Sequence, residues 1–193
     1  LKKEKIILSV GRFFGYLKDK KHKMLIYSYE KLVKQKKVSG WSLHLAGSAG
    51  EGDKLYLAEL KKLSKGIKIF LHPNISFEEL KNLYGKSSIY WHAAGYSETE
   101  PTRMEHFGIS TVEAMAAGAV PVVINLGGQK EIVENGKSGF LWNTPDELID
   151  LTIKIIRGKK RRDNLSKEAV KRSKMYSKEK FCQKISELVS TKK

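Results

Sequence analysis

The sequence predicts an α/β domain in which about six parallel strands form a doubly wound, Rossmann-like sheet, with further helices at the C-terminus. Short apolar runs alternate with helical patterns along almost all of the 193 residues. Strands that are separated by helices pair in parallel, and the helices then cover both faces of the sheet. With 40% hydrophobic residues, the chain can bury the core that one such domain needs.

The predicted strands are short runs of apolar residues. In order along the chain they are residues 5–11 (KIILSVG), 41–47 (WSLHLAG), 67–71 (IKIFL), 88–93 (SIYWHA), 120–124 (VPVVI) and 139–142 (GFLW). The tryptophans of these segments, Trp41, Trp91 and Trp142, are expected to lie in the core or at a sheet edge. His44 and His92 are expected to be packing residues of the same strands.

Between the strands, apolar residues recur at helical spacing. The predicted helices are residues 22–35, 54–64, 76–85, 109–118 and 129–136, and the chain from residue 144 to the end is helical with one break near Ser177. Ser76 and Glu79 form a capping box, and Gly118 and Gly136 end two helices. At the start of the last helical stretch, Thr144 is the predicted N-cap, Pro145 takes the first helical position and Glu147 is the glutamate of a capping box.

The composition favours anionic partners. Against 21 Asp and Glu residues stand 37 Lys and Arg, which gives a net charge of +16. Phosphates, nucleic acid or an acidic membrane face would suit that charge, although a solvated lysine-rich surface explains it equally well. A nucleic-acid-binding module would need basic residues and aromatics gathered on one face, and here they look dispersed. The single cysteine, Cys182, and the lack of a signal-peptide pattern predict a cytoplasmic protein.

A ligand of such a sheet binds beyond the carboxyl ends of its strands. The stretch EHFGISTVEAM lies at that edge and places a helix start at Gly108, between Glu105 and Glu113. Free amides at a helix start attract anions, and the two carboxylates could accept hydrogen bonds from hydroxyl groups. The donors there are the amides of Phe107, Gly108, Ile109 and Ser110. In the alternative interpretation, Glu113 caps its own helix and Glu105 is solvated.

Cations follow the first predicted strand at the same edge. Gly11 and Arg12 come directly after it, and Lys18, Lys20 and Lys21 follow within ten residues. A guanidinium and an ammonium at a strand's carboxyl end are good ligands for a diphosphate. A solvated loop is the alternative.

The whole pattern resembles retaining glycosyltransferases of family 4. The matching pieces are GR followed by lysine, WSLHLAGS, EELKNLYGKSSIYW, the E-x7-E spacing from Glu105 to Glu113, and PVVINLGGQKEIVENGKSGFLW. The resemblance is to the C-terminal, nucleotide-sugar-binding half of their two-domain GT-B fold, and it is greatest to GDP-mannose-dependent α-1,2-mannosyltransferases that extend lipid-linked oligosaccharides. It implies that residues 1–193 are one donor-binding domain, and that the N-terminal acceptor domain is absent.

The resemblance also implies roles for the candidate residues. Glu105 contacts the transferred sugar, Glu113 holds the ribose diol, and the amides of residues 107–110 meet sugar hydroxyls and phosphate. Arg12 neutralises the diphosphate together with Lys20, for which Lys18 is the alternative because the loop is longer than usual. Glu105, Arg12 and Lys20 are the predicted catalytic residues. Gly11 belongs to the predicted donor-binding set, and so does Ile75, in HPNIS, which falls where the family's backbone meets the nucleobase.

Neither a metal nor another cofactor is expected. The sequence has no D-x-D motif and no His, Cys and Asp cluster with ligand spacing. Charge growing on the departing diphosphate would meet Arg12, Lys20 and the helix start instead. The other interpretations are a glycosidase with paired carboxylates, a glycogen or starch synthase, and a nucleotide-sugar epimerase. Expected partners are a nucleotide-sugar donor, a glycan or lipid-linked acceptor and an anionic membrane, but no nucleic acid.

Overall fold

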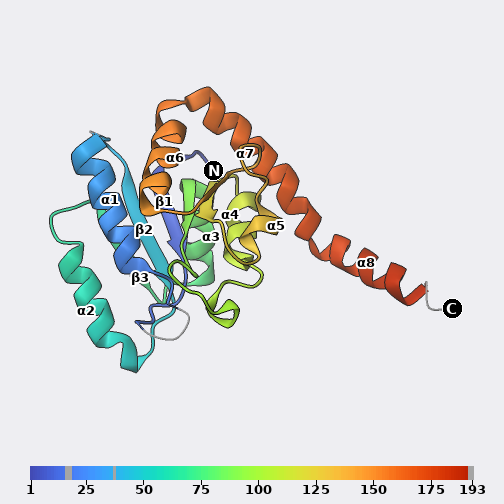
Figure 1. The fold of residues 1–193 in the computed structure, drawn as a ribbon, viewed down its shortest axis with the longest axis horizontal. Coiled ribbons are helices and arrows are strands. Elements are labelled where there is room, and N and C mark those ends of the chain that lie inside the picture. Colours follow the sequence, from blue (N-terminus) through green and yellow to red (C-terminus); the bar gives the residue numbers. More distant parts are fainter. Residues whose placement is uncertain (16–18, 37, 191–193) are drawn as a thin grey trace.

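The computed structural model describes residues 1–15, 19–36 and 38–190. Among these residues, six strands form one parallel sheet in the order β3-β2-β1-β4-β5-β6, which confirms the predicted fold class (Figure 1). The strands are β1 (Glu4–Val10), β2 (Ser42–Gly47), β3 (Ile69–Pro73), β4 (Ser87–His92), β5 (Val120–Ile124) and β6 (Phe140–Trp142).

Helices cover both faces of the sheet. They are α1 (His22–Lys36), α2 (Lys54–Leu63), α3 (Phe77–Lys86), α4 (Ile109–Ala116), α5 (Gln129–Ile132), α6 (Pro145–Arg157), α7 (Lys159–Ser173) and α8 (Lys178–Ser190). One core cluster joins the sheet to α1, α2 and α6, and the other joins it to α3, α4, α5 and α7. The strands contribute alternate residues to the two clusters, as a sheet buried on both faces requires. Trp41, Trp91 and Trp142 are buried as predicted.

Local capping chemistry sets several helix ends as the sequence indicates. Ser76 and Glu79 form the expected reciprocal box, and the hydroxyl of Thr144 accepts from the amide of Glu147. At the end of α4 the amide of Gly118 donates to Met115, and the next amide reaches back to Ala114. Gly118 has a φ of 82°, which is the left-handed conformation that this C-terminal motif needs.

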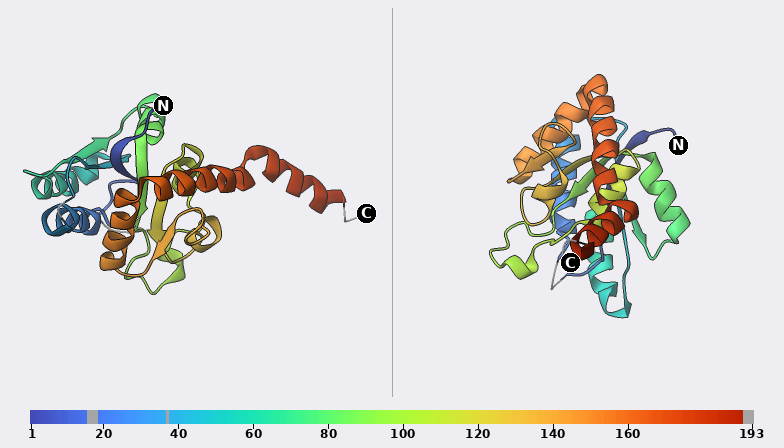
Figure 2. Two further views of the ribbon diagram at one scale, coloured as in Figure 1. Left: turned by 90° about the horizontal axis from the view of Figure 1, so that it is seen from above. Right: turned by 90° about the vertical axis from the view of Figure 1, so that its right-hand side faces the viewer.

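Three predicted boundaries are wrong. The helix predicted over 129–136 ends at Ile132, because Val133 is extended. The strand predicted over 67–71 lies two residues later, so His72 and Pro73 belong to β3. The C-terminal helical stretch breaks at Gly158 as well as near Ser177, which separates α6 from α7. Beyond that second break α8 projects away from the rest of the molecule, and all its residues are exposed (Figure 2).

Candidate functional site

The candidate site lies at the carboxyl edge of the sheet, where β1 and β4 are neighbours. From these two strands the chain moves outward in opposite directions, and doubly wound sheets bind their ligands at such a point. Arg12 and Lys20 belong to the loop after β1, and Glu105 belongs to the loop after β4, residues 93–108. Residues far apart in the sequence therefore meet at the edge where the sequence predicted a site.

Lys20 and Glu105 form an ion pair across this edge. Nζ of Lys20 donates to Oε2 of Glu105 at 2.7 Å, although the residues are 85 positions apart. Gly11 makes room for the pair, because a Cβ there would lie 2.6 Å from Cγ of Lys20. The aliphatic chain of Lys20 thus packs against the end of β1. The alternative in which Glu105 is simply solvated is wrong.

Arg12 lies on the same loop but has a different environment. Its side chain is exposed, and its Cζ lies 5.6 Å from the ring centroid of Phe14. No carboxylate within the described ranges forms an ion pair with Arg12, so its donors can reach an anion. Lys21 is instead engaged, with Nζ 2.7 Å from Glu98. Lys18, the alternative to Lys20, lies outside the described residues.

His92 joins this cluster, although the sequence suggested only packing. It ends β4, it is 3% exposed, and neither ring nitrogen has a hydrogen-bond partner among the residues that the structure describes. Nε2 lies 3.7 Å from Oε2 of Glu105, which makes the contact electrostatic rather than a hydrogen bond. Burial lowers the pKa of His92, so the ring is neutral near pH 7. The His92 ring and the Lys20 ammonium hold the pKa of Glu105 well below its usual range.

The N-terminus of α4 has no side-chain cap. Gly108 occupies the N-cap position with a φ of 87°, and no side chain accepts a hydrogen bond from the first turn. A Cβ at Gly108 would also lie 2.4 Å from Nε2 of the buried Gln129, so both conformation and space require glycine. The amides predicted to bind a ligand belong to this helix start and its approach, and they are Phe107, Gly108, Ile109 and Ser110. Such donors, with the helix dipole behind them, suit an anion.

Glu113 lies one turn inside α4 and points toward α3. Its Oε2 accepts a hydrogen bond from the hydroxyl of Tyr84 at 2.9 Å, and the carboxylate remains exposed. The alternative in which Glu113 caps its own helix is therefore wrong. A cavity of about 290 Å³ beside it lies between α3 and α4, with Phe77 and Leu80 in its lining. Ile75, the predicted nucleobase contact, lies just before α3 and is half-buried against the second core cluster.

The loop after β5 supports the loop that carries Glu105. The amide of Gly128 donates to the carbonyl of Glu105 at 2.9 Å. A Cβ at Gly127 would lie 2.3 Å from that carbonyl oxygen, and one at Gly128 would lie 2.1 Å from the carbonyl oxygen of His106. This close approach explains the Gly-Gly pair, which the sequence analysis left without a role.

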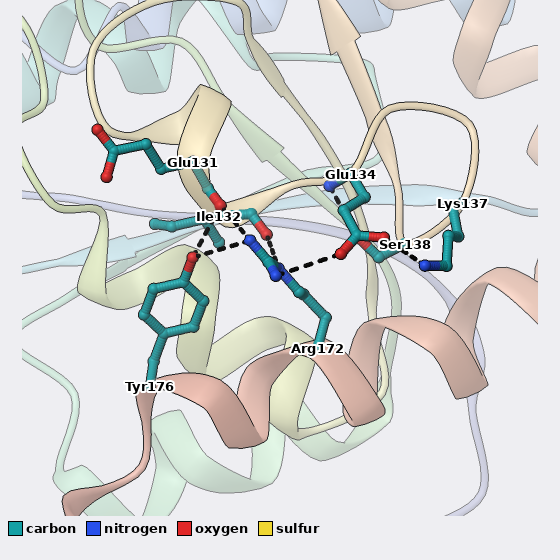
Figure 3. A network of polar contacts seen from close by, with 7 residues as sticks. All are labelled: Glu131, Ile132, Glu134, Lys137, Ser138, Arg172 and Tyr176. Atoms are coloured by element: carbon teal, nitrogen blue, oxygen red, sulfur yellow. Dashed lines mark hydrogen bonds and ion pairs between the residues drawn. The ribbon is translucent and has the colours of Figure 1, made fainter. Parts of the chain in front are cut away.

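A polar network connects α5 to the end of α7, as Figure 3 shows. Arg172 donates to the carbonyls of Glu131 and Ile132, and the hydroxyl of Tyr176 also donates to Glu131. The ring of Tyr176 packs edge-on against that of Phe107, with centroids 6.1 Å apart. Arg172 of α7 and Tyr176 just after it therefore support the segment that leads into α4. The network also includes Glu134, Lys137 and Ser138.

No group of three or more His, Cys, Asp or Glu side chains in the described ranges of the chain is arranged to hold a metal ion. Within the same ranges, no helix has the length and apolar character that crossing a membrane requires.

Residues 1–172 match the family model described as glycosyl transferases group 1. The chain belongs to this family. A relative from Xenopus tropicalis, GDP-Man:Man(3)GlcNAc(2)-PP-Dol alpha-1,2-mannosyltransferase, is 36% identical over 147 residues, which are 72% of this chain and 28% of the frog protein. The human protein of that name is 32% identical over 163 residues, covering 78% of this chain and 31% of its own. The chain thus spans about a third of the length of these relatives.

Solved structures show that this chain has the fold of one half of a GT-B enzyme. Anabaena HepE in complex with UDP-glucose is similar with a TM-score of 0.78 and 22% identity, over 97% of this chain and 49% of HepE. The C-terminal domain of a group 1 glycosyl transferase from Francisella tularensis has a TM-score of 0.70 and 20% identity, over 90% of this chain and 87% of that domain.

Proposed function

We propose that this chain is the donor-binding domain of a retaining glycosyltransferase and binds a nucleoside diphosphate sugar. The observation that carries the proposal is the meeting, at one sheet edge, of the exposed Arg12, the Lys20–Glu105 pair and the uncapped start of α4. Cations and helix amides suit the diphosphate, and carboxylates suit hydroxyl groups. Membership of the glycosyl transferases group 1 family supports the same assignment.

In this proposal each residue has one task. Arg12 and Lys20 bind the diphosphate and stabilise the charge that grows on it as the glycosidic bond breaks, together with the amides at the start of α4. Glu113 accepts hydrogen bonds from the ribose hydroxyls, with Tyr84 holding its carboxylate. Glu105 accepts a hydrogen bond from the transferred sugar. Ile75 borders the nucleobase. No metal takes part in these tasks.

We infer that the donor is GDP-mannose. Support comes from the frog and human relatives, whose names specify GDP-Man as their donor. HepE was solved with UDP-glucose, but it is only 22% identical to this chain. UDP-glucose is therefore the competing donor against which GDP-mannose is tested. The acceptor is a glycan or a lipid-linked oligosaccharide, again by likeness to the relatives' names. Because the chain spans less than a third of the relatives' length, these 193 residues by themselves should bind donor but transfer little sugar.

Isothermal titration calorimetry of the chain with GDP, UDP and ADP, and with GDP-mannose and UDP-glucose, tests the function. GDP and GDP-mannose should bind more tightly than the other nucleotides, with equal affinity in the presence and absence of EDTA. Loss of binding in EDTA would refute metal independence. Failure of every nucleotide to bind would refute the proposed function itself.

We also propose that the chain works at the cytosolic face of an anionic membrane. The support is the junction of α6 and α7, where the basic residues Arg157, Lys159, Lys160 and Arg161 are all exposed. Basic residues near such a surface contribute about 1 kcal/mol each. Co-sedimentation with vesicles should rise with their content of phosphatidylserine and fall in the double variant Lys160→Glu, Arg161→Glu. Binding that ignores lipid charge would contradict this.

A further inference from the structure

We propose that His92 is a positioning residue for Glu105, and that its ring holds the carboxylate in place when the donor's diphosphate draws the Lys20 ammonium away. The inference rests on the proposed function, in which Lys20 binds the diphosphate and Glu105 binds the transferred sugar. It gives His92 a role in recognising the sugar half of the donor.

His92 is a buried polar side chain at the point where the ligand is expected. It is 3% exposed and ends β4 beside β1, and neither ring nitrogen has a hydrogen-bond partner in the described part of the molecule. An unsatisfied buried polar group is costly, so natural cores rarely keep one without a reason. A leucine could fill the same volume if packing were the whole role. The polar ring therefore needs a partner, and the nearest candidate is Glu105.

One carboxylate oxygen faces both basic groups. Oε2 of Glu105 lies 2.7 Å from Nζ of Lys20 and 3.7 Å from Nε2 of His92. The ammonium holds the carboxylate at hydrogen-bond distance, while the imidazole is just too far away to do so. Movement of the ring or the carboxylate by about 0.5–1 Å would bring Nε2 within the normal range of an N–H···O bond.

Donor binding changes the partner of Lys20. A diphosphate carries more negative charge than one carboxylate, so the ammonium is expected to move toward it. The Glu105 side chain is only 23% exposed, and a mostly buried carboxylate that loses its cation is strongly destabilised unless another donor replaces it. His92 is the neighbouring donor, and a hydrogen bond from its ring would keep the Glu105 carboxylate oriented toward the sugar.

The charged groups that face His92 are Glu105 and Lys20. Because burial keeps the imidazole neutral near pH 7, it has a single N–H to donate. The inferred role requires that proton on Nε2. Asn and Gln can then distinguish the two nitrogens, because the amide nitrogen of Gln reaches the position of Nε2 and that of Asn reaches the position of Nδ1.

Calorimetric titration of the 193-residue chain with GDP and with GDP-mannose tests the inference. In His92→Leu both GDP and GDP-mannose leave the Glu105 carboxylate without a donor, but only GDP-mannose also loses the aligned acceptor of its sugar. The ratio of the Kd for GDP to the Kd for GDP-mannose should therefore fall about tenfold. His92→Gln should restore most of that ratio, and His92→Asn should not. Circular dichroism confirms that each variant is folded.

The outcomes separate this inference from the proposed function. If the wild-type chain binds neither GDP nor GDP-mannose, and neither UDP nor UDP-glucose, the proposed function fails and the inference falls with it. If the wild type binds GDP-mannose and His92→Leu keeps the ratio, or weakens both ligands equally, only the role of His92 is refuted. If His92→Leu does not fold, the polar variants decide, and equal ratios in His92→Gln and His92→Asn overturn the inference.

Discussion

Arg12 and Lys20 are close in the sequence but differ in what they are bound to. Lys20 is held by Glu105 at 2.7 Å, whereas Arg12 has its guanidinium exposed beside Phe14. A ligand with a diphosphate would compete with Glu105 for Lys20, but it would meet Arg12 without competition. At the scale of single residues, Arg12 should therefore contribute directly to diphosphate affinity, and the contribution of Lys20 should depend on Glu105.

Arg12→Ala should weaken GDP far more than guanosine. A lost hydrogen bond to a charged group costs about 1.5–3 kcal/mol, and guanosine has no phosphate to lose it. Calorimetric titration with the two ligands measures the difference. Arg157→Ala removes the same charge at the opposite edge of the sheet and should leave both affinities unchanged. Equal losses for GDP and guanosine in Arg12→Ala would show that Arg12 does not face the phosphates.

Glu105→Gln and Glu113→Gln should have different effects. Glu105→Gln removes the carboxylate that competes for Lys20, so GDP should bind at least as well as it binds to the wild type, while GDP-mannose loses affinity. Glu113→Gln should weaken GDP and GDP-mannose alike, because the ribose is common to both. The same pair of titrations measures both variants. Equal weakening of the two ligands by Glu105→Gln would refute the assignment of Glu105 to the sugar.

At the scale of elements, the position of α4 depends on the loop after β5. Gln129 begins α5 and is fully buried against Gly108, and Gly127 and Gly128 lie directly below the loop that leads into α4. The tight turn after β5 thus fixes the position of the start of α4. A side chain at Gly108 would disturb both the helix start and this packing.

Gly108→Ala should lower the free energy of unfolding by about 1–3 kcal/mol, because alanine is strained at a φ of 87° and its Cβ meets the Gln129 amide. Urea unfolding followed by circular dichroism measures the change. Gly52→Ala is the matched control, since a Cβ there has nothing within 4 Å and its φ is not positive. Equal stabilities of the two variants would contradict the strain at Gly108.

Local signals in the sequence were enough to predict most elements of this fold. The capping box that begins at Ser76 and the glycine that ends α4, Gly118, depend only on residues a few positions away, and both are present in the structure. The early end of α5 was missed because Arg172, 40 residues beyond Ile132, takes the carbonyl that the next helical turn would use. The edge of the site followed from topology, but the Lys20–Glu105 pair and the approach of His92 depend on three-dimensional contacts that spacing does not encode.

For the molecule as a whole, basic side chains gather at both ends of the parallel strands, at the amino edge of the sheet as well as at the carboxyl edge that holds the candidate site. At the amino edge, where α3 and α4 end, Nζ of Lys3 donates to the carbonyls of Ser87 and Ala117 at 2.8 and 2.6 Å. Cations at helix C-termini complement the helix dipoles. A cavity of about 620 Å³ at that edge is lined by further basic residues, including Lys5, Arg157 and Arg162. Part of the net charge of +16 therefore has a structural role far from the candidate site.

The stability of the whole domain should fall as the pH falls below about 6.5. Burial lowers the pKa of His22 from 6.5 to about 4, so the folded state keeps the ring neutral while the unfolded state binds a proton. The unfolded state gains about 2 kcal/mol from this residue between pH 7 and pH 5, and the loss stops growing below the folded pKa. Urea unfolding of wild type and His22→Gln at both pH values measures it.

His22→Gln should lose less stability on acidification than the wild type. The exposed His106 supplies the control, since His106→Gln should lose as much as the wild type. Identical acid sensitivity in all three proteins would mean that His22 is not the group that takes up the proton.

The exposure of α8 has a consequence for proteolysis. A helix of 13 residues with none of its side chains buried depends on its intrinsic propensity, and isolated helices of that length are marginal in water. Its backbone should open often, so trypsin should cut at Lys178, Lys180 or Lys184 long before it reaches the lysines of α1. The fragment that ends near Tyr176 should melt at the same temperature as the intact chain, because Arg172 and Tyr176 still connect the end of α7 and the turn that follows it to α5.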